Sequence, residues 1–178
     1  MIKKLVNYLT ILRIFLAFII FALLMNKDGY VLALFLFFIA GITDYADGYL
    51  ARKYKATSSL GEILDPIADK ILIVFIIFAL AVNLSSYLIA FMGSIIISRE
   101  IWVSALRDYN SRNYNHEATK VTYLAKIKTT VQLFTISVYL IGIAFSKMLL
   151  IVFGDIFLII ATIITIYTGY EYTIKTFK

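Results

Sequence analysis

Residues 44–69 read DYADGYLARKYKATSSLGEILDPIAD. Four aspartates lie in this stretch, two on each side of a basic and polar connection at residues 53–59. The first pair belongs to the apolar segment 30–52, and the second pair belongs to the apolar segment 60–82. Each segment is long enough to cross a bilayer, which takes a helix of roughly 20 residues. The stretch therefore predicts two antiparallel membrane helices with carboxylates inside them.

The rest of the chain repeats this alternation of long apolar segments and short polar breaks. Of its 178 residues, 62% are hydrophobic and only one is proline. Since soluble domains are nearer half apolar, we expect an all-α integral membrane protein that forms a single domain over residues 1–178. The first segment lacks a small-residue cleavage site and is interpreted as a spanning helix. The six predicted transmembrane helices are residues 5–25, 30–52, 60–82, 86–106, 121–145 and 149–170.

The net charge of +6 is distributed unevenly about these helices. With alternating helices, only Lys27 and Lys147 fall on one side. The basic residues of the other side are Lys3, Lys4, Arg52, Lys53, Lys55, Arg107, Arg112, Lys120, Lys175 and Lys178. The positive-inside rule places both termini in the cytoplasm, and a compact chain of this kind suits a multi-pass protein of the cell (inner) membrane. The basic residues then indicate contacts with the lipid bilayer and not with nucleic acid.

Helical spacing places the aspartates of each segment on one helix face. The first stripe comprises Asp44, Asp47, Gly48, Ala51 and Arg52. The second stripe comprises Gly61, Asp65 and Asp69. Because the connection at residues 53–59 is short, the two helices are expected to be neighbours. The aspartate pairs then converge near the cytoplasmic surface.

Four clustered carboxylates repel one another unless cations neutralise them. The chain has no cysteine, and the ligands on offer are oxygens, which hard divalent ions such as Mg²⁺ or Mn²⁺ prefer. Two such ions would suit phosphoryl chemistry. The small residues of the two stripes leave room for a nucleotide to approach the backbone. The alternatives are a cation pathway or structural pairing with nearby basic residues, namely Arg52, Lys53 and Lys70.

The pattern Asp44-x2-Asp47-Gly48-x2-Ala51-Arg52-x8-Gly61-x3-Asp65-x3-Asp69 resembles the signature of the CDP-alcohol phosphotransferase family at every fixed position. The resemblance implies six membrane helices, a homodimer and an active site that opens to the cytoplasm. It implies that the aspartates hold two divalent metal ions and that Asp69 is also the general base for an acceptor hydroxyl. The positions implied to bind the CDP-linked lipid are Asn7, Thr10, Asp47, Gly48, Ala51, Arg52, Ser58 and Gly61.

The remaining motifs resemble the bacterial phosphatidylglycerophosphate synthases. They are Asn7-x2-Thr10-x2-Arg13, Arg99-Glu100-x3-Ser104-x2-Arg107 and Lys126-x-Lys128-Thr129-Thr130-x-Gln132. This resemblance implies CDP-diacylglycerol as the donor and sn-glycerol 3-phosphate as the acceptor. Cardiolipin synthase and phosphatidylinositol-phosphate synthase are alternatives within the family. A small cation transporter, with the aspartates as an ion path, is the alternative from another class.

A phosphorylated acceptor requires cations, and arginine suits bidentate contact with phosphate. Arg99 and Arg107 lie about 80° apart around a helix, so both are expected to face one cavity. Lys126 and Lys128 point about 160° apart, so at most one of them faces the acceptor, and either assignment is open. Alternatively, Arg107 and the lysines anchor helix ends by snorkelling. Glu62 and Glu100 are candidate partners for arginine side chains, and simple surface exposure is the alternative for both.

Overall fold

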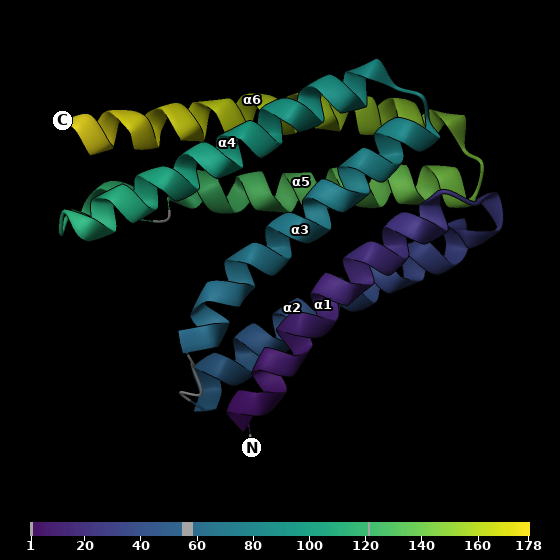
Figure 1. Cartoon of the computed structure of the whole chain (residues 1–178). Helices are drawn as coiled ribbons and strands as arrows, with labels where there is room; N and C mark the ends of the chain where they lie inside the picture. The colour runs from purple at the N-terminus through teal and green to yellow at the C-terminus, as the bar shows by residue number, and fades with distance from the viewer. Residues whose placement is uncertain (1, 55–58, 121) are drawn as a thin grey trace. The chain divides into compact units, whose positions relative to one another are not determined.

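The computed structural model describes residues 2–54, 59–120 and 122–178, with the side chains of residues 7–50, 53–54, 61, 63–115, 117–120 and 122–178 (Figure 1). Its α-helices are α1 (Ile2–Leu24), α2 (Tyr30–Tyr54), α3 (Ser59–Asn83), α4 (Tyr87–Arg112), α5 (Tyr123–Ala144) and α6 (Met148–Phe177). Two short 3-10 helices, η1 (Lys27–Gly29) and η2 (His116–Thr119), lie in the connections. No strand occurs in the described ranges, so the predicted all-α fold is confirmed.

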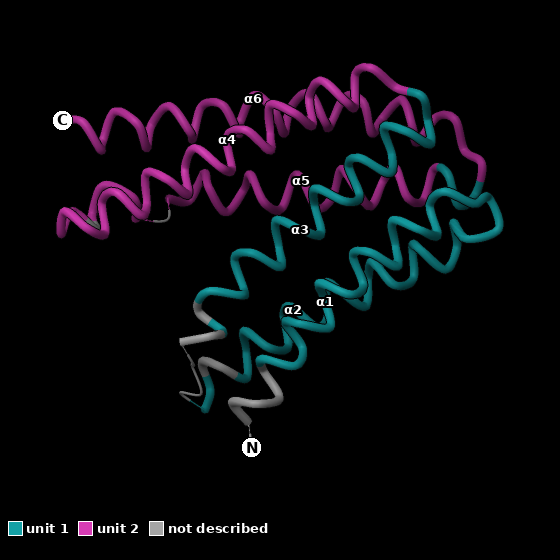
Figure 2. The backbone as a smooth tube through the Cα atoms, viewed as in Figure 1, with its two compact units in different colours: residues 1–85, 143–145 teal, residues 86–142, 146–178 magenta. Residues whose placement is uncertain are grey.

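The chain forms two compact units (Figure 2). Unit 1 comprises residues 1–85 and 143–145, and unit 2 comprises residues 86–142 and 146–178. Each unit has its own buried residues and its own polar contacts, and each is described by itself below. A single domain over residues 1–178 stays a prediction.

In unit 1, α1 packs against both α2 and α3. Ala17 of α1 and Ala33 and Ala40 of α2 are fully buried, and such small side chains let membrane helices approach closely. Phe18 of α1 meets Phe75 of α3 edge to face, with 4.5 Å between the ring centroids. The middle helix of the unit is therefore α1, so residues of α2 and α3 can meet through side chains of α1.

In unit 2, α4 packs against α6, and α5 is joined to α6 by polar contacts. Gln132 Nε2 donates a hydrogen bond to Thr165 Oγ1 at 3.0 Å. The Tyr139 hydroxyl donates to Asp155 Oδ1 at 2.6 Å. Gly154 lies beneath the Tyr139 ring, and a Cβ atom there would be 2.7 Å from two ring carbons. The α5–α6 contact thus combines hydrogen bonds with a glycine notch.

Several helices have the length and composition of membrane spans. Within the described residues, five segments meet both criteria, and α3, which contains Asp65, Asp69 and Lys70, is not among them. Large apolar side chains such as Phe35 and Ile163 are more than half exposed, which is expected of helices that face lipid. The chain is a membrane protein, while the predicted sixth span, residues 60–82, stays a prediction.

Two helices run further than the apolar segments predict. The spans expected at residues 86–106 and 149–170 continue as α4 to Arg112 and as α6 to Phe177. Ion pairs at i,i+4 spacing lie in these extensions: Arg112 Nη2 is 2.8 Å from Asp108 Oδ2, and Lys175 Nζ is 2.6 Å from Glu171 Oε1. Such pairs stabilise helix beyond the apolar stretch. The loop predicted from residue 107 therefore begins only after Arg112.

Candidate active site

The aspartates of α2 and α3 converge on one face of α1. That face presents Thr10 and Arg13, which are three positions apart and therefore point the same way. Both side chains are almost completely buried, with Arg13 1% exposed. The convergence that the helical spacing predicts is present, and the residues of α1 are what join the two helices.

Arg13 contacts three of the four aspartates. Its Nη1 lies 2.7 Å from Asp44 Oδ1 and 2.5 Å from Asp69 Oδ1, while Nη2 pairs with Asp47 Oδ2. The Asp47 side chain is 4% exposed, whereas those of Asp44 and Asp69 are 51% and 53% exposed. One guanidinium thus bridges both helices. It leaves two of the carboxylates reachable from outside.

The fourth aspartate is held by Thr10. The Thr10 hydroxyl donates to Asp65 Oδ1 at 2.6 Å and lies 3.5 Å from Asp47 Oδ2. A hydroxyl has one proton to donate, so the shorter contact is the main bond. Thr10 therefore orients Asp65, and its predicted contact with the lipid donor stays a prediction.

The other predicted donor-binding residues lie along the same helices. Gly48 of α2 and Asn7 of α1 are half-buried, and Gly61 of α3 is buried. The side chains of Ala51 and Arg52 lie outside the described residues, as does Ser58 altogether. The structure thus places two of these positions on the helices that contain the aspartates and the third on α1, which packs against both of those helices.

The donor atoms fit a divalent-metal site in type and charge. Among the described residues, no group of three acidic or histidine side chains is arranged to hold a metal ion. Three of the aspartates instead contact Arg13. Four carboxylates and one guanidinium nevertheless have a formal charge of −3. All the acidic ligands are oxygens, which suit Mg²⁺ or Mn²⁺.

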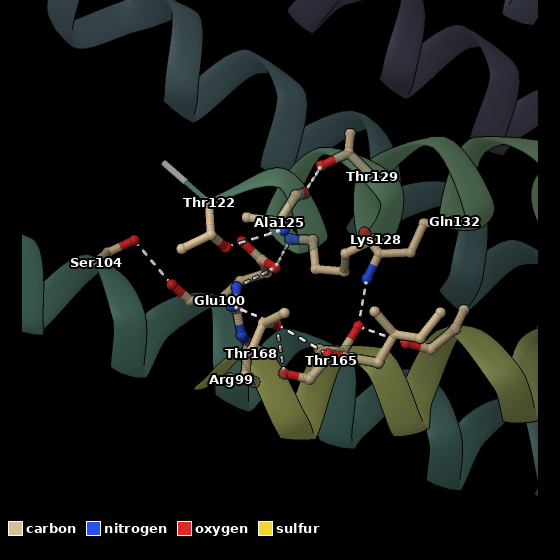
Figure 3. Close-up of polar contacts among 12 residues, drawn as sticks. Arg99, Glu100, Ser104, Thr122, Ala125, Lys128, Thr129, Gln132, Thr165 and Thr168 are labelled. Carbon is tan, nitrogen blue, oxygen red and sulfur yellow. Dashed lines mark hydrogen bonds and ion pairs between the residues drawn. The ribbon is translucent and has the colours of Figure 1, made fainter. Parts of the chain in front are cut away.

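Unit 2 contains a buried basic cluster, drawn in Figure 3. Arg99 of α4 donates from Nη1 to Glu100 Oε1 at 3.1 Å and from Nη2 to Thr168 Oγ1 of α6 at 2.8 Å. Lys128 of α5 pairs with the same Glu100 oxygen. The side chains of Arg99 and Lys128 are each 9% exposed. Glu100 therefore joins two buried cations, which confirms it as an arginine partner.

The second arginine lies on the same side of α4. The guanidinium carbons of Arg99 and Arg107 lie 5.8 Å and 5.9 Å from the centroid of the Tyr172 ring. Both arginines thus contact the same ring within unit 2, while the cavity that they were expected to share stays a prediction. The structure also distinguishes the two lysines, since Lys128 is buried in the cluster and Lys126 is exposed.

Sequence reasoning did not assign a role to Arg13, Thr168 or Tyr172. One signal could have found the two α6 residues: Thr165, Thr168, Tyr172 and Thr176 recur at i, i+3, i+7 and i+11 in an apolar helix. Polar residues with this spacing mark the face that turns away from lipid. The same argument applies to Thr10 and Arg13 on α1.

Helices that suit a bilayer, together with clustered carboxylates and a buried basic cluster, are features of a membrane protein with a functional site among its helices. Within that class, the chain belongs to the CDP-alcohol phosphatidyltransferase family, which matches residues 3–167.

Similarity to individual proteins extends over nearly the whole chain. A protein of Rickettsia felis is 40% identical over 173 residues, which are 96% of this chain and 93% of that protein. A Rickettsia prowazekii protein is 38% identical over the same shares of both chains. A Haemophilus influenzae protein is 38% identical over 128 residues, 71% of this chain and 69% of its own. All three are named CDP-diacylglycerol–glycerol-3-phosphate 3-phosphatidyltransferase. The chain is an enzyme of phospholipid biosynthesis that transfers a phosphatidyl group.

Proposed function

We propose that the enzyme transfers the phosphatidyl group of CDP-diacylglycerol to sn-glycerol 3-phosphate, producing phosphatidylglycerophosphate and CMP. The similarity to proteins with this activity in their names, over 96% of the chain, is the observation that carries the proposal. The buried basic cluster supports it, because an acceptor that already contains a phosphate requires cations that a neutral alcohol does not.

Asp69 is the proposed general base. Its side chain is 53% exposed, so an acceptor hydroxyl can approach, and Arg13 holds its Oδ1 atom. The hydroxyl oxygen attacks the β-phosphorus, which carries the diacylglycerol, while its proton passes to Asp69. The bond from that phosphorus to the CMP oxygen breaks, and CMP leaves. Asp69 then loses its proton to solvent.

Two divalent ions, Mg²⁺ or Mn²⁺, are the proposed cofactors, and members of this family generally depend on such metals. The residues that would hold them are Asp44, Asp47, Asp65 and Asp69. When bound, ions of this kind supply neutralisation of the diphosphate and of the charge on the leaving group. Thr10 orients Asp65 for this role, whereas Arg13 would have to share the other three carboxylates with the ions.

The proposed site for the acceptor phosphate comprises Arg99, Arg107 and Lys128. Together with Glu100, these residues have a formal charge of +2, which matches a phosphate dianion. Arg99 and Lys128 are already desolvated, so a phosphate would meet cations that have given up most of their water. Lys126 is exposed and is proposed to anchor its helix end by snorkelling.

The proposed location is the cell (inner) membrane, with the termini and the active site on the cytoplasmic side. The distribution of basic residues between the loops supports this orientation. Assembly as a homodimer is part of the same proposal, and it rests on the family resemblance.

The direct test measures CMP release by the purified enzyme in detergent with CDP-diacylglycerol and Mg²⁺ or Mn²⁺. The acceptors are glycerol 3-phosphate, phosphatidylglycerol and inositol phosphate. We expect release with glycerol 3-phosphate, loss of release on chelation of the metal, and loss in Asp69→Asn. Asp28→Asn, which alters an exposed aspartate of η1, is the matched control and should stay active. Release with only another acceptor would overturn the proposed acceptor.

A further inference from the structure

Tyr172 of α6 is placed between the two arginines and the core of unit 2. It is 1% exposed, and its ring centroid lies 5.8 Å from Arg99 Cζ and 5.9 Å from Arg107 Cζ. Both separations are within the range of about 6 Å in which a guanidinium interacts with an aromatic ring. One ring thus contacts two cations that are eight positions apart on α4.

The ring itself is held in place by its surroundings. Tyr172 packs with the buried residues Val103 and Leu106 of α4. Its hydroxyl oxygen accepts a hydrogen bond from the Thr122 backbone N–H at 3.3 Å. Because packing and the hydrogen bond both restrict the Tyr172 ring, the ring gives the two guanidinium groups a fixed surface to contact.

Arg99 is constrained on its other side as well. Glu100 and Thr168 accept from its two Nη atoms, and a Cβ atom added at Gly169 would lie 2.9 Å from Arg99 Cγ. Arg99 Nε is buried and has no hydrogen-bond partner in the part of the chain that the structure describes. Leaving a buried donor unpaired is costly, so the Arg99 guanidinium is not fully satisfied by the described part of the protein.

We propose that Tyr172 is a positioning residue, which holds Arg99 and Arg107 at the separation needed to bind one phosphate group together. The proposal rests on the proposed function, in which these arginines bind the acceptor phosphate. Tyr172 acts through the arginines and does not touch the reacting atoms. Its ring face, and not its hydroxyl, is the part that matters.

This role predicts a specific pattern of kinetic constants. Tyr172→Phe keeps the ring and removes only the bond from Thr122, so it should behave nearly as the wild type. Tyr172→Leu removes the ring and should raise KM for glycerol 3-phosphate roughly 10-fold. The KM for CDP-diacylglycerol and kcat at saturating acceptor should change little, because the donor and the carboxylates are untouched. Tyr170→Leu, at an exposed position of the same helix, is the control.

The experiment measures both KM values and kcat for these variants in detergent, with the melting temperature of each protein. Tyr172→Met, a more adaptable side chain, replaces Tyr172→Leu if that variant does not fold. An unchanged KM for the acceptor, or equal rises for donor and acceptor, would overturn the positioning role while the wild-type activity stands. Wild-type turnover with only a phosphate-free acceptor would overturn the proposed function and the positioning role together.

Discussion

At the scale of single residues, Arg13 of unit 1 is a buried cation that pairs with several carboxylates. Its side chain is 1% exposed and bridges carboxylates of α2 and α3. A buried ion pair gains little net stability, since desolvation offsets much of the attraction. Removing one partner is different, because the remaining charge is then buried without compensation. Asp47, with a side chain 4% exposed, would be that charge.

Replacing Arg13 tests this dependence. We expect Arg13→Gln to lower the free energy of unfolding by about 3–5 kcal/mol, since Asp47 loses its cation. The matched control is Arg112→Gln, whose pair with Asp108 is 78% and 62% exposed and should contribute about 0–1 kcal/mol. Denaturant titration in detergent, followed by fluorescence, gives both values. Equal effects of the two substitutions would contradict the role given to Arg13.

At the scale of elements, helix contacts in both units depend on small residues. In unit 2, Gly154 of α6 lies against the ring of Tyr139 of α5, whose hydroxyl bonds to Asp155 one position along. A side chain at position 154 would push the ring away and break that bond. The packing of α5 against α6 therefore depends both on the absence of a side chain at Gly154 and on the hydrogen bond between Tyr139 and Asp155.

The glycine notch leads to a prediction with an internal control. Gly154→Ala should destabilise the protein by about 1–3 kcal/mol, because the added Cβ would overlap the Tyr139 ring. Gly41→Ala is the same substitution in α2, at a position where a Cβ would meet nothing within 4 Å. Its effect should stay within about 1 kcal/mol and favour the helix. The melting temperatures of the two variants are compared in one detergent. Equal decreases in melting temperature would contradict the proposed close contact between Gly154 and the Tyr139 ring.

At the scale of the whole molecule, the distribution of charge determines how the chain should lie in the bilayer. The basic residues gather in the termini and in alternate connections, which predicts that they face the cytoplasm. The connection at Lys27–Gly29 should then face outward, and that after Arg112 should face inward.

The absence of cysteine from the chain makes this orientation simple to test. Asn26→Cys and Ser111→Cys each introduce one thiol at an exposed position next to these connections. In intact cells, a membrane-impermeant maleimide should label the cysteine at position 26 and leave the one at position 111 unlabelled until the membrane is opened. Labelling in the reverse order would mean that the orientation is inverted.

The sequence by itself determined the helical membrane class, the approximate helices and the aspartate cluster. Each of these follows from local or periodic properties: apolar length predicts a span, and residues at i, i+3 and i+4 share a face. The ends of α4 and α6 were not predicted, because helix continues into polar sequence where ion pairs stabilise it.

Only the tertiary structure decided the partners. Neighbouring basic residues were the expected alternatives for pairing with the aspartates, and the structure adds a cation from another helix, Arg13, more than thirty positions away from Asp47. The choice of Lys128 over Lys126 for the basic cluster, and the contact of Tyr172 with both arginines, depend on how α4, α5 and α6 pack. Spacing along one helix tells which residues share a face, but only packing determines what that face meets.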